Sequence, residues 1–159
     1  MTNPTQRHGI IVGNIGARLK FAMVRRGCQS FQGDIRVQKD ADRRATDKPK
    51  PDVVVRCGPG SPESDLQTYI DDPVVVVEVL SPSTQDVDRG RKLEFYKSLG
   101  TLQHIVIVYQ DQKRIEHYRR DGDDWTADDA LTKPEDVLDL SAVAFTMTVS
   151  EAYFDVAIS

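Results

Sequence analysis

Hydrophobic positions along the chain change between helical and strand spacing, which predicts a mixed α/β fold. From Arg7 to about Arg26 the apolar residues recur at helical intervals, and Gly27 supplies a stop signal. The apolar positions are Ile11, Ile15, Leu19 and Ala22. We therefore expect one amphipathic helix at the start of the chain.

Strand-like segments follow this helix. Ser30–Val37 has strand character, whereas residues 38–50 are polar without an apolar period and indicate an exposed connection. Residues 51–57, PDVVVRC, are rich in β-branched side chains and end at the turn signal of residues 58–60. The pattern predicts a second strand there and then a loop as far as Asp72.

The sequence PVVVVEVL, residues 73–80, is an almost continuous apolar run of strand length. A strand that is apolar at successive positions is typically buried on both faces. We expect it at the centre of the sheet, with Glu78 as its single charged residue.

The second half of the chain predicts one helix and several strands. Helical spacing covers Arg89–Leu99 and ends at Gly100. Residues 104–109 and 114–119 have strand patterns around a polar turn, which predicts a hairpin. The alternating residues 143–149 predict one more edge strand, before a short turn around residues 152–154.

Composition places these elements in one domain, residues 1–159. Hydrophobic residues make up 39% and charged residues 29% of the chain, and the apolar runs are too short to span a bilayer. The N-terminus has no apolar run behind basic residues, so no secretory signal is visible and we expect a cytoplasmic location.

Charge limits how nucleic acid could be bound. The net charge of -4 does not indicate a non-specific nucleic-acid binder, so any DNA contact must come from a local patch. A solvated surface is the equal alternative for the basic residues concerned. These candidates are Arg25, Arg26, Arg43, Arg44, Lys48 and Lys50.

Several kinds of site find little support. Cys28 and Cys57 show no CxxC spacing and no nearby histidine cluster, so we interpret them as two buried thiols rather than as a disulfide or a zinc site. No phosphate-binding glycine loop, nucleophile elbow or HExxH helix is present.

Glu78 is the most informative position for chemistry. An ionised carboxylate in a valine-rich central strand is costly unless a positive group accompanies it. Strand alternation places Asp52 and Val54 on one face of their strand, so Asp52 can meet Glu78 across neighbouring strands. Such oxygen ligands suit Mg²⁺ or Mn²⁺, which hold phosphate and acidify bound water. An ordinary ion pair for Glu78 and a turn carboxylate for Asp52 are the alternatives.

Lys92 adds weight to this interpretation. It shares the inward stripe of its helix with Phe95, Tyr96 and Leu99, at i, i+3, i+4 and i+7. An ammonium group near Glu78 can polarise water or stabilise charge on phosphorus, whereas a solvated head group is the alternative. His8 lies on the apolar side of the first helix, where a core histidine is the more common arrangement.

The pattern Pro51-Asp52, then EVLSPST at residues 78–84, then Asp86, Asp88, Lys92 and Tyr96 resembles the Uma-two-type restriction endonuclease family of the PD-(D/E)xK nuclease superfamily. The resemblance runs from His8 to Phe154. It implies a restriction-endonuclease-like fold, a mixed β-sheet core flanked by helices, with divalent-metal cleavage of DNA.

By this resemblance, Asp52 and Glu78 ligate the metal together with the Val79 carbonyl, and Lys92 completes the catalytic set. Further candidates for supporting roles are His8, Asp88 and Tyr96, with Ser81 and Ser83 of the SPST turn. The serine hydroxyls can orient the carboxylates and phosphate, and capping of the next element is their more common role. The superfamily lysine usually stands two residues after the acid, where this chain has Leu80, so Lys92 is interpreted as its migrated substitute. Family members usually carry an upstream helix and short hairpin, and this chain begins almost at the helix that contains His8.

Three hypotheses follow. The first is a DNA endonuclease that uses Mg²⁺ or Mn²⁺, with DNA as its partner, no membrane association and a homodimer as one possible assembly. The second is a catalytically inactive nuclease-fold module that binds nucleic acid or protein. The third is an oligomerisation protein that pairs exposed strands near residues 104–118 or 143–149 with another copy.

Overall fold

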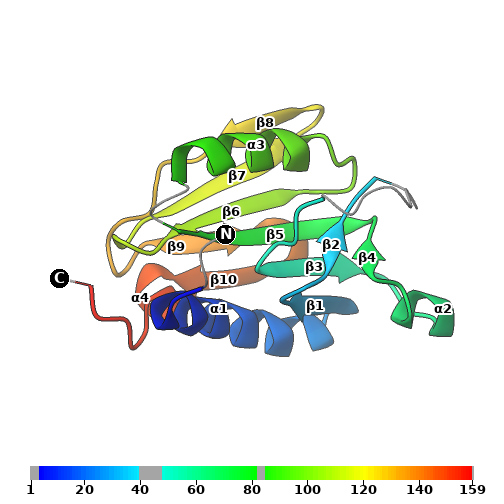
Figure 1. Ribbon diagram of the computed structural model, residues 1–159, viewed down its shortest axis with the longest axis horizontal. Helices are drawn as coiled ribbons and strands as arrows, with labels where there is room; N and C mark the ends of the chain where they lie inside the picture. The colour runs from blue at the N-terminus through cyan, green and yellow to red at the C-terminus, as the bar shows by residue number, and fades with distance from the viewer. Residues whose placement is uncertain (1–3, 40–47, 82–84, 159) are drawn as a thin grey trace.

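A six-stranded mixed sheet forms the centre of the computed structural model, which describes residues 4–39, 48–81 and 85–158, apart from the side chains of 85–88 (Figure 1). Its strands in spatial order are β1 (Cys28–Gln32), β3 (Val53–Cys57), β5 (Pro73–Leu80), β6 (His104–Tyr109), β7 (Ile115–Asp121) and β8 (Asp124–Ala127). β5 and β6 are parallel, and the other neighbours are antiparallel. The predicted mixed α/β fold is therefore confirmed.

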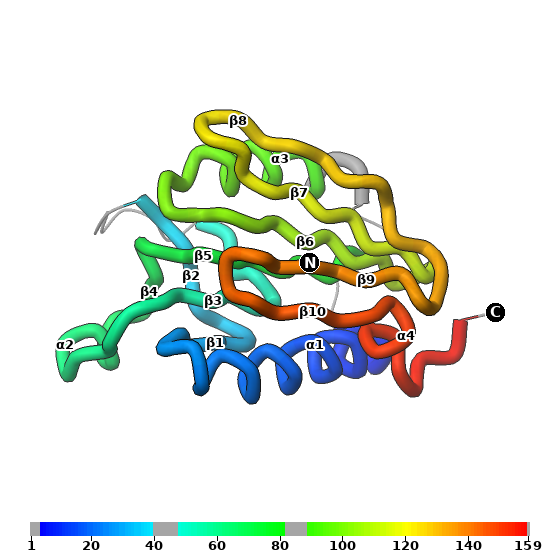
Figure 2. Tube along the Cα trace, turned by 180° about the vertical axis from the view of Figure 1, so that it is seen from behind, coloured from blue at the N-terminus to red at the C-terminus, as the bar shows by residue number. Residues whose placement is uncertain are grey.

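Elements pack on both faces of this sheet. Helix α3 (Gln85–Lys97) covers one face, as Figure 1 shows, and the hairpin of β9 (Val137–Leu140) and β10 (Phe145–Thr148) lies across the other, as Figure 2 shows. Helix α1 (Gln6–Val24), the 3-10 turn η2 (Ser141–Val143) and α4 (Val149–Ala152) accompany that hairpin.

The central strand β5 separates the two hydrophobic cores. Val75, Val77 and Val79 belong to the core beneath α1 and the β9–β10 hairpin. Val76 and Leu80 belong to the core beneath α3. Because successive side chains of a strand point to opposite faces, β5 is buried on both sides, as its apolar run predicts.

Small elements near the sheet were not all predicted. The expected strand Ser30–Val37 is interrupted at Gly33, whose φ of +90° is a conformation that favours glycine. After this turn β2 (Arg36–Val37) leaves the main sheet and pairs in parallel with β4 (Tyr69–Ile70). The segment expected to be only a loop thus contains β4 and the short helix α2 (Pro62–Asp65).

Most of the larger elements match their predicted positions. The first helix and the β6–β7 hairpin are confirmed, and α3 begins at Gln85, four residues before the predicted Arg89. The expected edge strand within residues 143–149 is β10, but it pairs with β9 outside the main sheet. The sequence patterns did not predict the strands β8 and β9.

The strand topology also corrects the oligomerisation hypothesis. β6 lies between β5 and β7, and β7 lies between β6 and β8, so residues 104–118 do not form an exposed edge.

No helix in the described part of the chain is long and apolar enough to cross a membrane. The homodimer, the cytoplasmic location and the assignment of residues 1–159 to one domain stay predictions.

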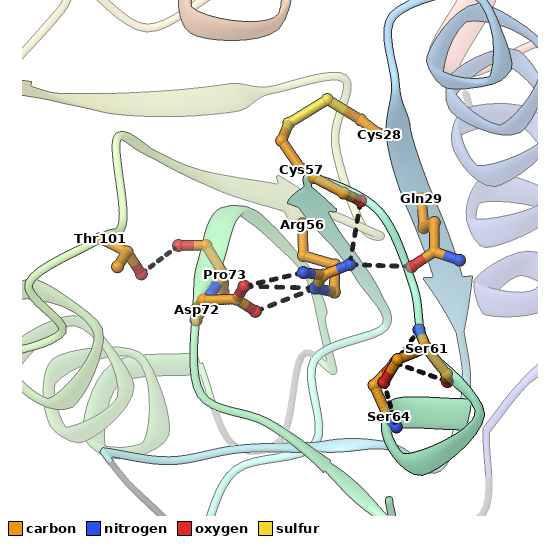
Figure 3. A network of polar contacts seen from close by, with 10 residues as sticks. Cys28, Gln29, Arg56, Cys57, Ser61, Ser64, Asp72, Pro73 and Thr101 are labelled. Atoms are coloured by element: carbon orange, nitrogen blue, oxygen red, sulfur yellow. Dashed lines mark hydrogen bonds and ion pairs between the residues drawn. A yellow bond between two sulfur atoms is a disulfide. The ribbon is translucent and has the colours of Figure 1, made fainter. Parts of the chain in front are cut away.

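Cys28 and Cys57 form a disulfide, so the interpretation as two buried thiols is wrong (Figure 3). The antiparallel register of β1 and β3 places the two residues directly opposite each other. Beside this bond, Arg56 donates hydrogen bonds to the Asp72 carboxylate and to Gln29. The spacing of the cysteines in the sequence carried no sign of this pairing, because only the strand register creates it.

A histidine pair connects the main sheet to the β9–β10 side. The ring atoms His104 Nδ1 and His117 Nε2 are 2.9 Å apart, and the backbone N–H of Ala142 donates to His104 Nε2. His104 must therefore carry its proton on Nδ1 and donate it to His117. His117 Nδ1 lies 3.2 Å from an Asp128 carboxylate oxygen. Burial and the neighbouring His117 lower the pKa of His104 to about 4.

Reduction of the disulfide should destabilise the protein. The bond closes a separation of 29 residues, and a loop of this length corresponds to about 3.5 kcal/mol of stabilisation. Denaturant unfolding with and without a reducing agent measures the difference. A Cys28→Ser/Cys57→Ser double variant should have the unfolding midpoint of the reduced protein, and the reducing agent should not change it. Equal unfolding midpoints for oxidised and reduced wild type would contradict the assignment.

The histidine pair should make the protein sensitive to acid. The folded pKa of His104 lies below its ordinary value of 6.5, so its stabilising contribution is complete above pH 6.5 and is lost as the pH falls through about 4. The expected loss is on the order of 3 kcal/mol. An NMR titration of the ring resonances gives the direct measurement, and a His104 midpoint near 6.5 would refute it.

Candidate active site

Asp52 reaches the site because of the way β3 begins. β3 and β5 pair Val53 with Val77, and the same register continued by one residue places Asp52 opposite Glu78. Pro51 precedes it and has no backbone N–H for a ladder. The Asp52 carboxylate instead accepts the backbone N–H of Val79 at 2.7 Å. This hydrogen bond fixes Asp52 beside the end of the central strand.

Glu78 is almost completely buried, with 2% of its surface exposed. Its Oε2 lies 3.1 Å from the Lys92 ammonium nitrogen, and its Oε1 accepts a hydrogen bond from the Tyr96 hydroxyl. Burial raises the pKa of Glu78 to about 7; Asp52 adds to the rise, while Lys92 and Tyr96 oppose it. Glu78 therefore ionises at a higher pH than an exposed glutamate.

Helix α3 supplies both partners of Glu78 from one face. Lys92 and Tyr96 are four residues apart and so lie on neighbouring turns of the same helical stripe. Tyr96 is fully buried, whereas a quarter of the Lys92 side chain remains exposed. The lysine thus reaches inward to a buried carboxylate while keeping contact with solvent.

His8 approaches Asp52 from the first turn of α1. Its Nε2 is 3.0 Å from Asp52 Oδ1. The hydrogen bond to Asp52 raises the pKa of His8 against the opposing effect of burial, and the charges of Asp52 and Glu78 raise it further. Thr5 caps this helix by accepting the His8 backbone N–H, and its hydroxyl donates to Gln110. The helix start is thereby attached to the far end of β6.

The remaining predicted residues have different outcomes. Ser81 follows β5 directly and is half-buried. Ser83 lies outside the described residues, and so does the side chain of Asp88 in α3. The backbone carbonyl of Val79 belongs to the same strand end as Glu78. The structure thus brings together His8, Asp52, Glu78, Val79, Lys92 and Tyr96.

Of the described basic residues proposed for phosphate contact, Lys50 stands two residues before Asp52, whereas others lie away from this site. Arg25 follows the last turn of α1, about 25 Å along the helix from His8. Lys48 lies near α3, with its ammonium 5.2 Å from the centre of the Phe95 ring. Arg43 and Arg44 lie outside the described residues.

A second carboxylate, Glu116, was missed. β5 pairs Glu78 with Ile107 and β6 pairs Ile107 with Glu116, so the two glutamates stand on one cross-strand row of the same face. They are two strand spacings apart, about 10 Å. Arg89 of α3 donates to Glu116 Oε1 at 2.8 Å. The spacing of Arg89 and Lys92, three residues apart on a helix, was the available signal.

The donor atoms present suit a hard cation. Carboxylate and carbonyl oxygens are the ligands of Mg²⁺, which commonly takes one or two carboxylates and completes its shell with water. In the described ranges, no three His, Cys, Asp or Glu side chains gather as a cation site. Asp52, Glu78 and the Val79 carbonyl therefore match an open, water-rich site rather than a closed protein cage.

The fold has a solved counterpart. A crystal structure described as a putative nuclease belonging to DUF820 from Anabaena variabilis ATCC 29413 aligns with a TM-score of 0.74. The two chains are 16% identical, and the alignment covers 96% of this chain and 83% of the other. This likeness confirms the expected restriction-endonuclease-like fold.

Two sequence relatives come from Synechocystis sp. strain PCC 6803, and both are uncharacterized proteins. The first, slr1290, is 32% identical over 127 residues, which cover 79% of this chain and 63% of the relative. The second, sll1609, is 33% identical over 73 residues, which cover 46% of this chain and 41% of the relative. This chain thus spans less than two thirds of either relative. Residues 1–150 match the Uma2 family, described as "Putative restriction endonuclease", and the chain belongs to that family.

Proposed function

We propose that this protein is a divalent-metal-dependent DNA endonuclease that hydrolyses phosphodiester bonds. The observation that carries the proposal is the meeting of Asp52, Glu78 and Lys92 at one end of the central strands. The description of the family and that of the solved structural neighbour both name nucleases, which supports the same activity.

The protonation of Glu78 supports a cation at this position. Its pKa of about 7 reflects a carboxylate whose burial and neighbouring Asp52 outweigh the help of Lys92. Further positive charge beside the two carboxylates would favour the ionised form. Asp52, Glu78 and the Val79 carbonyl are the residues that would hold Mg²⁺ or Mn²⁺. Such an ion, when bound, neutralises phosphate charge and lowers the pKa of a coordinated water.

The surrounding residues have distinct roles in this proposal. Tyr96 holds Glu78 in place through its hydroxyl, and the Val79 N–H together with His8 orients Asp52. The Lys92 ammonium is the group that would orient the attacking water and stabilise negative charge at phosphorus as the P–O bond breaks.

One observation favours the alternative of an inactive nuclease-fold module that binds nucleic acid or protein. Both oxygens of Asp52 already have protein partners, His8 on Oδ1 and the Val79 N–H on Oδ2. A carboxylate oxygen can accept more than one interaction, so these contacts leave room for a cation. In the alternative, DNA binding would not depend on metal and no strand would be cut.

Substitution of either carboxylate should greatly reduce activity. Asp52→Ala and Glu78→Ala should lose Mn²⁺ and Mg²⁺ binding in calorimetry and should reduce nicking of supercoiled plasmid by about 100-fold or more. Glu94→Ala, an exposed acidic residue of the same α3 helix, is the matched control and should behave as wild type. A folded wild type that binds no divalent cation would overturn the nuclease proposal and favour the binding module.

Lys92 should separate catalysis from cation binding. Lys92→Ala removes the ammonium group but leaves both carboxylates, so plasmid nicking should fall by about 100-fold while saturating Mn²⁺ still binds in calorimetry. Circular dichroism would verify that the variant folds. Nicking at the wild-type rate would show that the lysine serves only as a counter-ion for Glu78.

A further inference from the structure

Two arginines converge on Glu116 beside the candidate active site. Arg89 of α3 contacts Glu116 Oε1 through Nε and Nη2, both at 2.8 Å. Arg114, just before β7, contacts Oε2 through Nη2 at 3.1 Å and through Nε at 3.4 Å. The Tyr109 hydroxyl donates to the same Oε2. The two guanidinium groups are thus held by one carboxylate in the same side-on orientation.

This orientation leaves one edge of each guanidinium available. Within the described part of the chain, the Nη1 groups of Arg89 and Arg114 make no hydrogen bond. The two arginine side chains are 30% and 36% exposed, whereas Glu116 is only 12% exposed. The carboxylate is therefore the buried support, and the arginines present N–H donors to solvent.

The charge of this cluster is not balanced. Burial raises the pKa of Glu116, yet hydrogen bonds from Arg89, Arg114 and Tyr109 and the charge of Arg89 lower it overall, so Glu116 is ionised at neutral pH. One arginine would neutralise it. The second leaves a net charge of about +1 on a rigid arrangement of planar donors, which is the geometry that binds phosphate oxygens well.

We infer that Arg89 and Arg114, oriented by Glu116, form a subsite for a backbone phosphate of DNA a few nucleotides from the phosphate that is cut. This inference rests on the proposed function. Glu116 stands on the cross-strand row of Glu78, about 10 Å away, which equals about three axial rises of one DNA strand. A strand passing over the exposed ends of Lys92, Arg89 and Arg114, parallel to this buried row, would contact both sites without any reading of its bases.

DNA binding measured without metal tests the subsite independently of cleavage. A short fluorescein-labelled duplex is titrated with the full chain in EDTA, by anisotropy, at several salt concentrations between about 50 and 200 mM. Arg114→Gln should weaken binding about tenfold and reduce the slope of log K against log salt by about 0.9, the value for one lost phosphate contact. Arg89→Gln should have an effect of similar size.

Arg119→Gln is the matched control. It removes the same charge five residues further along the chain, within β7, but Arg119 alternates with Tyr118 and points to the opposite face, where it pairs with Asp128. It should change neither affinity nor slope. Thermal unfolding of each variant verifies that it folds.

The outcomes separate the two proposals. Equal effects of Arg114→Gln and Arg119→Gln, or no effect of either, would refute the subsite even if the wild type cuts DNA. A selective loss with Arg114→Gln in a protein that never nicks plasmid would support the subsite and refute the nuclease. Absence of any metal-free DNA binding by wild type would refute the subsite, whereas the nuclease proposal would still be decided by plasmid nicking with Mn²⁺ or Mg²⁺.

Discussion

The burial of one carboxylate in the centre of a valine-rich sheet is the constraint around which this site is organised. Glu78 occupies a position where water cannot solvate it, so its ionised form depends on the groups placed against it. Lys92 and Tyr96 meet this requirement from α3, while Asp52 adds a second negative charge. Such an arrangement is expensive for stability and therefore points to a function.

The site also depends on both layers that cover the sheet. His8 reaches Asp52 from α1, on one side, whereas Lys92 reaches Glu78 from α3, on the other. Residues from both layers therefore contact carboxylates at the same end of the central strands. These partners come from segments that are far apart in the sequence. The site therefore forms only when α1, the sheet and α3 have packed against one another.

Features that depend on periodicity within one helix or strand were predicted better than features that depend on how distant segments pair. The apolar run of β5 predicted a central strand, and the helical stripe of α3 predicted an inward Lys92, because each depends on periodicity within one element. The Cys28–Cys57 bond depends on the register between two strands, which spacing in sequence does not encode. Glu116 was missed because a glutamate in an exposed-looking strand beside arginines is ordinary in sequence, and only strand order reveals its alignment with Glu78.

Helix α3 sets the distance between two cationic side chains that lie over the sheet. Arg89 and Lys92 are three residues apart, a rise of about 4.5 Å, yet their long side chains end on carboxylates of two strands that are not neighbours. A rotation or translation of α3 would move both cations together. A backbone shift therefore cannot change the position of one cation without changing that of the other. In this chain, side-chain length and chemistry are therefore the only means of adjusting one cation without the other, because both take their place from one helix orientation.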